Sequence, residues 1–219
     1  MKSLRVAVLA SGNGTNFQAL QDACTSGYVH AEIVCVVTNK RDAPVLDRAA
    51  RAGVEGVFVD HKGLSREQRD EVLLAHYEER GVDFACHTGY MRILGRPYSK
   101  AMEGRAFNVH PSLLPAFAGA HPMEDAWEWG VKTSGVTIHF HTEELDAGPI
   151  VLQRSVDIDR RDTFEAFERK MHLVEYTIYP KAVKLFADGA LRTEGRRVLI
   201  DHDVDDPPWA GELPPGLRS

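Results

Sequence analysis

Four short, mostly apolar segments in the first half of the chain predict buried strands. They are rich in branched residues, as strands covered on both faces of a sheet usually are. They span residues 4–10, 32–38, 54–59 and 82–87. Segments with helical spacing or helix end signals lie between them, at residues 17–23, 43–52 and 65–80. This alternation indicates an α/β fold with a mostly parallel central sheet and helices on both faces.

The second half of the chain continues this pattern less regularly. Residues 134–140 alternate, which places Val136, Ile138 and Phe140 on one face of a strand. Another strand is expected to end at His110. The remaining expected strands cover residues 150–156 and 198–200, the latter at the edge of the sheet. Helices are expected at residues 123–129 and 163–187, and Pro180 is expected to kink or divide the longer one.

The length and composition are typical of a soluble globular protein. The chain has 219 residues, of which 43% are hydrophobic and 26% charged. We expect a single domain over residues 1–200 and a loose tail over residues 201–219, where four prolines occur. No segment is long and apolar enough to span a membrane, and the N-terminus has no cleavage-site pattern. We therefore expect a cytoplasmic protein with no membrane partner.

The charge and the cysteines argue against two classes of protein. A formal net charge of −6 disfavours nucleic-acid binding, which requires a basic face. Cys24, Cys35 and Cys86 are odd in number and scattered, so we interpret them as reduced packing residues. The ten histidines lack metal-type spacing, and we expect no metal site.

Candidate chemistry appears where the strand that ends at His110 stops. Asn108 and His110 are two residues apart, so their side chains point to the same face of that strand. An amide that donates to an oxyanion, an imidazole that carries a proton and a carboxylate such as Asp146 make a workable acyl-transfer set. Taken singly, a histidine at a strand end is also typical of structural packing, and an Asp before Ala-Gly-Pro is typical of a turn.

A glycine-containing loop, residues 11–16, follows the first strand and opens into a helix. This arrangement directs free backbone N–H groups and the positive helix end at a phosphate. The loop has neither the G-x-G-x-x-G fingerprint nor the Lys-Ser/Thr ending of a P-loop. A tight turn capped by Asn and Thr is the alternative interpretation.

Two separated motifs resemble the folate-dependent formyltransferase family over roughly the first 190 residues. They are N-x-H-P-S-L-L-P at residues 108–115 and E-L-D-x-G-P at residues 144–149. The resemblance implies a Rossmann-like formyltransferase fold in which Asn108, His110 and Asp146 are catalytic. It also implies that His121, in a G-x-H segment, lies near the active site.

The resemblance further implies two binding regions. The sequence S-G-N-G-T-N is similar to the phosphate-binding loop of the glycinamide ribonucleotide branch of the family. The implied ribonucleotide-binding residues are Gly14, Thr15, Asn16, His172 and Glu175. The implied folate-binding residues are Arg66, Met91, Arg92, Ile93, Leu94, Asn108, Thr142, Glu143, Glu144, Leu145 and Asp146. His87 and Thr88 depart from the small or apolar residues of the family pattern, and His87 either packs in the sheet or tunes the folate pocket.

The implied reaction transfers a formyl group from 10-formyltetrahydrofolate, a cosubstrate, to the amine of 5-phosphoribosylglycinamide in purine synthesis, without a metal. The partners expected are these small molecules alone, and the chain is expected to act as a monomer or homodimer. Three alternatives remain open. Formyltetrahydrofolate deformylase, a hydrolase, shares the catalytic set but normally has an additional regulatory domain. Methionyl-tRNA formyltransferase shares S-L-L-P but needs an RNA-binding domain. A non-enzymatic nucleotide-binding module would leave the catalytic set unused.

Overall fold

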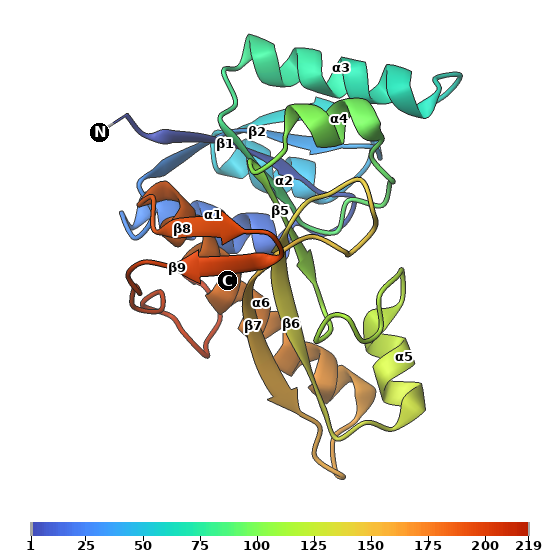
Figure 1. Cartoon of the computed structure of the whole chain (residues 1–219), viewed down its shortest axis with the longest axis vertical. Helices are drawn as coiled ribbons and strands as arrows, with labels where there is room; N and C mark the ends of the chain where they lie inside the picture. The colour runs from blue at the N-terminus through green and yellow to red at the C-terminus, as the bar shows by residue number, and fades with distance from the viewer. Residues whose placement is uncertain (1, 219) are drawn as a thin grey trace.

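The computed structural model describes residues 2–218, which form one nine-stranded sheet with the order β3-β2-β1-β4-β5-β6-β7-β9-β8 (Figure 1). Neighbouring strands are parallel from β3 to β5 and antiparallel from β5 to β7. The strands are β1 (Leu4–Leu9), β2 (Ala31–Thr38), β3 (Glu55–Phe58), β4 (Phe84–His87), β5 (Ala106–His110), β6 (Thr133–Phe140), β7 (Ile150–Asp157), β8 (Leu191–Glu194) and β9 (Arg197–Ile200). The predicted mostly parallel sheet is confirmed.

Helices cover both faces of this sheet (Figure 1). The helices are α1 (Thr15–Thr25), α2 (Val45–Arg51), α3 (Arg66–Glu79), α4 (Arg96–Ala101), α5 (Pro122–Trp129), α6 (Phe164–Ala187) and the short 3-10 helix η1 (Pro215–Leu217). On one face α1, α2 and α6 contribute Phe17, Val45 and Met171 to a buried apolar cluster. On the other face α3 and α4 contribute Leu73 and Tyr98 to a second cluster. Two separate cores therefore hold the strand ends in place.

The structure differs from the sequence-based expectations at four elements. Helix α4 and strand β8 were not predicted, because both are short and carry little periodicity. Strand β9 lies between β7 and β8, so β8 and not residues 198–200 forms the edge. Pro180 lies inside α6, which continues as one helix from Phe164 to Ala187. Pro180 therefore does not divide this helix, and the alternative expectation of a kink stays a prediction.

The C-terminal segment explains why α6 tolerates Pro180. A proline has no backbone N–H, so the carbonyl of Tyr176, four residues earlier, loses its helical donor. Trp209 is 3% exposed, and its indole Nε1 donates to that carbonyl at 3.1 Å. The backbone N–H of Gly216 donates to Asp22 Oδ2 in α1 at 2.8 Å. The segment after residue 200 is thus packed against the helices, whereas its prolines had suggested a loose tail.

The three cysteines are free thiols, as expected. Burial raises the pKa of Cys24 to about 12 and that of Cys35 to about 11, and it also raises the pKa of Cys86. All three side chains therefore remain protonated packing residues at neutral pH.

Candidate active site

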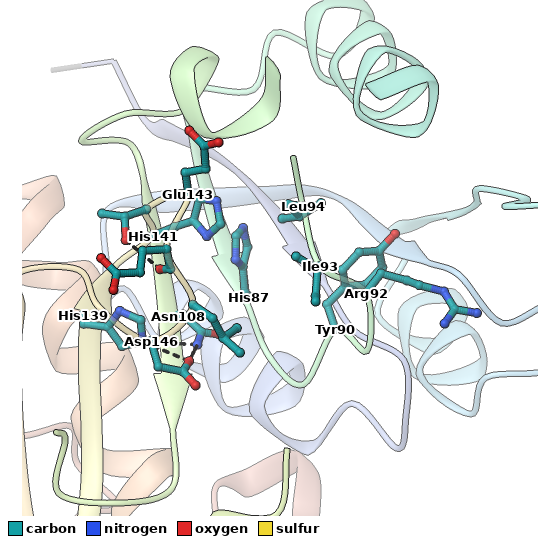
Figure 2. A pocket seen from close by; sticks show the side chains of 13 residues that line it. His87, Tyr90, Arg92, Ile93, Leu94, Asn108, His139, His141, Glu143 and Asp146 are labelled. Carbon is teal, nitrogen blue, oxygen red and sulfur yellow. Dashed lines mark hydrogen bonds and ion pairs between the residues drawn. The ribbon is translucent and has the colours of Figure 1, made fainter. Parts of the chain in front are cut away.

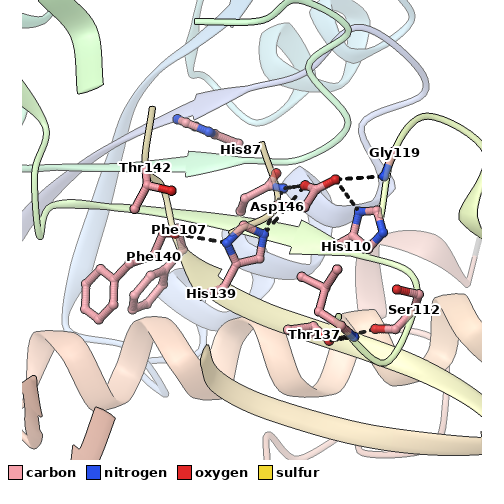
Figure 3. A network of polar contacts seen from close by, with 12 residues as sticks. His87, Phe107, His110, Ser112, Gly119, Thr137, His139, Phe140, Thr142 and Asp146 are labelled. Atoms are coloured by element: carbon pink, nitrogen blue, oxygen red, sulfur yellow. Dashed lines mark hydrogen bonds and ion pairs between the residues drawn. The ribbon is translucent and has the colours of Figure 1, made fainter. Parts of the chain in front are cut away.

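The candidate site lies at the carboxyl end of β5, where β5 pairs with the antiparallel strand β6. Asn108 is opposite His139 in this pairing, and His110 is opposite Thr137. The loop between β6 and β7 returns over this strand end and brings Asp146 to it. Figure 3 shows the Asp146 carboxylate between His110 and His139. The pairing of Asn108, His110 and Asp146, which rested on resemblance alone, is thus present in the structure.

Asp146 makes contacts through both carboxylate oxygens. Its Oδ2 lies 3.5 Å from His110 Nδ1 and accepts a hydrogen bond from the Gly119 backbone N–H at 3.0 Å. Its Oδ1 lies 3.4 Å from Asn108 Nδ2 and 3.9 Å from His139 Nε2. The side chains of Asp146 and His110 are only 4% and 5% exposed, so their attraction is weakly screened by water.

The second ring nitrogen of His110 is committed to the backbone. Nε2 lies 2.8 Å from the carbonyl oxygen of Phe117, which can only accept, so Nε2 carries a hydrogen. The opposite nitrogen, Nδ1, faces Asp146. Phe117 and Asp146, the residues that contact the two sides of the ring, both have positive φ values, 51° and 52°. Such backbone strain in residues other than glycine often occurs at functional sites.

His139 belongs to this network, although it was not among the residues predicted from the sequence. Its Nδ1 donates to the Phe140 carbonyl at 2.9 Å, which leaves Nε2 as an acceptor for Asn108 Nδ2 at 3.2 Å. Burial lowers the pKa of His139, although the Phe140 bond and the Asp146 charge oppose this shift. A neutral His139 therefore holds one amide hydrogen of Asn108. The other amide hydrogen makes only the longer contact to Asp146.

Three cavities meet at these side chains. The histidine cavity is lined by His87, His139 and His141 together with the loop from Thr142 to Asp146 (Figure 2). The central cavity contains His110 and shares Asn108 and Asp146 with the histidine cavity. The loop cavity is lined by residues 12–16 and by α6, and it shares Val109 and Pro111 with the central cavity. The three cavities adjoin one another over the end of β5, and we refer to them together as the groove.

The glycine loop is held open at the start of α1. Gly14, the N-cap residue, has a φ of 71°, and a Cβ there would lie 2.3 Å from a Val45 methyl. Only glycine fits this conformation and this close approach. The helix has no side-chain cap and no acidic residue in its first turn. Its first N–H groups and its positive end are therefore available for an anion.

The loop cavity brings the predicted phosphate loop next to two side chains of α6. Asn16 Nδ2 donates to Glu175 Oε2 at 2.8 Å, and His172 Nδ1 lies 3.1 Å from the same oxygen. This bond to Glu175 raises the pKa of His172, against the effect of burial. All five residues predicted to bind the ribonucleotide line this cavity. They are Gly14, Thr15, Asn16, His172 and Glu175.

The residues predicted to bind folate are mostly gathered around the histidine cavity. The cavity wall includes Arg92, Ile93, Leu94, Asn108, Thr142, Glu143, Glu144, Leu145 and Asp146, and Met91 lines the adjoining central cavity. Figure 2 shows the Arg92 guanidinium directed away from the three histidines. Arg66 and His121 are exposed and are not in the walls of the three cavities. Their roles remain predictions.

The electrostatics of the histidine cavity are set by burial. Burial lowers the pKa of His87 well below its ordinary value, and His141 and His139 act in the same direction. Burial and His139 lower the pKa of His141 to about 4. The imidazoles of this cavity are therefore neutral at pH 7. Within residues 2–218, no group of three or more His, Cys, Asp or Glu side chains is arranged to hold a metal ion, and none of the helices has the length and hydrophobicity to span a bilayer.

This fold and site define a Rossmann-like α/β protein with an amide, an imidazole and a carboxylate set for acyl transfer. The formyl transferase family model matches residues 4–183, and the chain belongs to the formyl transferase family.

Proteins of known identity resemble the chain over most of its length. The phosphoribosylglycinamide formyltransferase of Haemophilus influenzae is 39% identical, with 90% of this chain and 93% of that protein aligned. The crystal structure of glycinamide ribonucleotide transformylase 1 from Symbiobacterium toebii superposes with a TM-score of 0.88 at 43% identity, covering 91% of this chain and 94% of that one. The trifunctional purine biosynthetic protein adenosine-3 of Drosophila pseudoobscura is 44% identical over 86% of this chain. The aligned part is only 14% of the length of that protein.

Proposed function

We propose that the protein transfers the formyl group of 10-formyltetrahydrofolate to the amine of 5-phosphoribosylglycinamide in purine synthesis. The products are formylglycinamide ribonucleotide and tetrahydrofolate. The observation that carries this proposal is the groove formed by the three cavities. The loop cavity and the histidine cavity lie on either side of the central cavity, where Asn108, His110 and Asp146 are found. The names of two relatives that the chain covers over more than nine tenths of their length support the same reaction. Folate acts here as a cosubstrate, without a metal, in a cytoplasmic monomer or homodimer.

The two substrates occupy opposite ends of the groove. The ribonucleotide phosphate binds the N–H groups at the start of α1, and Glu175 and His172 hold the rest of the ribonucleotide. The pterin ring of the folate enters the histidine cavity between the 92–94 segment and the 142–146 loop. This arrangement brings the amine and the formyl carbon together in the central cavity, beside His110.

The catalytic set stabilises the transition state of the attack. The neutral amine adds to the formyl carbon, a C–N bond forms, and negative charge develops on the formyl oxygen. The Nδ1–H of His110, whose 3.5 Å contact to Asp146 is longer than an ordinary hydrogen bond, and the free hydrogen of the Asn108 amide donate to this oxyanion. The 3.4 Å contact between Asn108 and Asp146 is the one that the oxygen replaces, because the shorter bond to His139 holds the amide in place.

Collapse of the intermediate breaks the bond from the formyl carbon to N10 of the folate. The attacking amine must lose a proton and N10 must gain one, so the proton balance closes by transfer between these two nitrogens. Asp146 lies beside His110 and organises the water that carries the proton. A buried carboxylate at 3.5 Å is suited to this role because its attraction for the imidazolium is little screened.

Release of the folate product, followed by absorbance with and without 5-phosphoribosylglycinamide, tests this function. We expect release only when the ribonucleotide is present, together with one formylated ribonucleotide for each folate released. Release without the ribonucleotide would instead identify a hydrolase. Absence of release, with both ligands bound in calorimetric titrations, would leave a binding protein.

A further inference from the structure

Two imidazoles in the wall of the histidine cavity have no role in the proposed reaction. His87 ends β4, and His141 follows β6 directly. Their ring centroids are 4.8 Å apart, with an angle of 63° between the ring planes. His87 is only 5% exposed, yet both side chains line the cavity (Figure 2). Apolar side chains would fill this wall without the cost of burying polar nitrogens, so the two histidines call for an explanation.

Each of these rings is anchored through Nε2 to a hydroxyl group of α4. His87 Nε2 lies 2.8 Å from the Tyr98 hydroxyl, and His141 Nε2 lies 2.9 Å from the Ser99 hydroxyl. Helix α4 is itself fixed by Asp70, whose carboxylate accepts the backbone N–H groups of Gly95 and Tyr98. The Nε2 atom of each ring is therefore held in place by a hydroxyl group of α4.

The hydroxyl groups behind His87 set the direction of its hydrogen bond. Tyr77 and Tyr98 are buried, with their hydroxyl oxygens 3.4 Å apart. If Tyr77 donates to Tyr98 and Tyr98 donates to His87, both hydroxyl hydrogens have an acceptor. In the reverse direction the Tyr77 hydrogen would be buried without an acceptor among residues 2–218. His87 Nε2 is therefore the acceptor, and the proton of this neutral imidazole lies on Nδ1.

The same reasoning applies to His141. The Ser99 side chain is 8% exposed, and in the described part of the chain its hydroxyl has His141 Nε2 as its hydrogen-bond partner. Donation by Ser99 satisfies this hydroxyl and places the imidazole proton on Nδ1. Neither Nδ1 atom has a hydrogen-bond partner within residues 2–218, and neither Nδ1 atom is fully buried. Both Nδ1–H groups are therefore open to the cavity.

We propose that His87 and His141 present two fixed N–H donors to the histidine cavity. They make it selective for a ring edge that carries hydrogen-bond acceptors, such as a carbonyl oxygen or an unprotonated ring nitrogen. This inference rests on the proposed function, in which the ring is the pterin of the formyl donor. The two histidines are specificity determinants, and Tyr98 and Ser99 are positioning residues, because they act by fixing which nitrogen carries the proton.

Binding of a 5,8-dideazafolate, which keeps the ring carbonyl and N1 as acceptors, tests the donors directly. His87→Leu and His141→Leu remove the N–H groups, and we expect the dissociation constant to rise roughly 3- to 10-fold for each. The matched variants His87→Asn and His141→Asn are similar in size to the leucine variants and keep a donor near the position of Nδ1. They should recover most of the loss. Equal affinities for the Leu and Asn variants would overturn the proposal.

Nitrogen NMR of protein labelled with ¹⁵N-histidine reports the tautomers without any reference to activity. At pH 7 we expect His87 and His141 to be neutral, with the proton on Nδ1, and their Nδ1–H resonances to shift when the dideazafolate is added. Tyr98→Phe should allow the proton of His87 to occupy either Nδ1 or Nε2. Tyr77→Phe, the matched control, removes a hydroxyl one step further away and should leave the tautomer of His87 unchanged. A proton on Nε2, or a charged ring, would overturn the inference.

Steady-state kinetics separate a failure of this inference from a failure of the proposed function. If the wild-type protein transfers the formyl group, the leucine variants should raise KM for the formyl donor while kcat changes by less than about 2-fold, because the lost bonds act on binding of the ring. Transfer with an unchanged KM and an unchanged dissociation constant would overturn the inference alone. Absence of transfer by the wild-type protein would end the transferase proposal, and the NMR and binding tests of the two donors would still stand.

Discussion

The loop cavity and the histidine cavity both contain histidines, but the pKa values of these side chains are shifted in opposite directions. In the loop cavity, the bond to the Glu175 carboxylate raises the pKa of His172. In the histidine cavity, burial and mutual repulsion lower the pKa values of His87 and His141. The neighbouring groups, and not the residue type, therefore determine the direction in which the pKa of a histidine shifts. One end of the groove is therefore suited to a charged ligand and the other to a neutral ring.

The largest expected effect comes from breaking the centre that joins the two cavities. His110→Ala should lower kcat by at least about 10³-fold, because it removes an oxyanion donor and the charge partner of Asp146. Dissociation constants for the ribonucleotide and for a dideazafolate should change little, since the residues of the two outer cavities are intact. Single-turnover kinetics and calorimetric titration would measure the two effects.

Asp146→Asn is the companion variant, because it keeps the shape of the side chain and removes its charge. We expect a comparable loss of kcat. Circular dichroism should show that the variant is folded. Near-wild-type turnover in either variant would contradict the assignment of these residues.

The centre of the site was predictable from the sequence, whereas its support was not. Asn108 and His110 could be placed on one face because strand geometry fixes side chains two apart. The pairing of Asp146 with His110 could be inferred only from the family resemblance, since no local rule folds a distant loop back. His139 was missed because it lies in an alternating strand with no motif around it. Its role depends on cross-strand pairing with Asn108, which only the fold reveals.

The fold was predictable where the pattern was local. A helix was expected at residues 65–80, and in the structure Ser65 is the N-cap of α3 and forms a full capping box with Gln68. The continuity of α6 through Pro180 could not be predicted locally, because the donor that compensates for the proline belongs to Trp209, 33 residues from Tyr176. Prolines after residue 200 suggested a loose tail, since composition does not show where one tryptophan packs.

Acid unfolding should sharpen the contrast between the two cavities. The folded-state pKa of His141 is about 4, below its ordinary value of 6.5, so the unfolded chain binds more protons between these values. The stability from this group is complete above pH 6.5 and is lost as the pH falls toward 4. His141→Leu should therefore remove about 2 to 3 kcal/mol of the stability loss between pH 7.5 and 4.5. Urea unfolding at a series of pH values measures this.

The matched control is His172 in the loop cavity, whose pKa shift has the opposite sign. The folded-state pKa of His172 is raised, so its contribution is complete below pH 6.5 and is lost as the pH rises through the folded value. His172→Gln should therefore cost stability at low pH and little at high pH. The same pH slope in both variants would contradict the assigned charge states.

Gly14→Ala should disable one end of the groove only. The added Cβ would meet the Val45 side chain, and the φ of 71° disfavours any side chain. The loop must shift, so we expect the KM for the ribonucleotide to rise roughly 10- to 100-fold, as for the loss of one or two good phosphate contacts. Binding of a dideazafolate in the histidine cavity should be unchanged.

Gly27→Ala controls for backbone strain in the Gly14 experiment. Gly27 has a similar φ of 77°, but nothing lies within 4 Å of a Cβ added there. We expect a stability loss of about 1 kcal/mol and no change in either KM. An unchanged ribonucleotide KM in Gly14→Ala, with the protein folded, would argue against the phosphate loop.

The smallest expected effect concerns the support of α6, which lines the loop cavity and not the histidine cavity. Trp209→Phe removes the donor to the Tyr176 carbonyl and should cost about 1 to 2 kcal/mol of unfolding free energy. In a Pro180→Ala background the new backbone N–H of residue 180 can donate to that carbonyl, so the same substitution should cost about 1 kcal/mol less. Urea unfolding of the four proteins of this cycle measures the coupling. Additive costs would mean that the indole stabilises α6 through packing alone, and the hydrogen bond would not be the reason that the helix tolerates its proline.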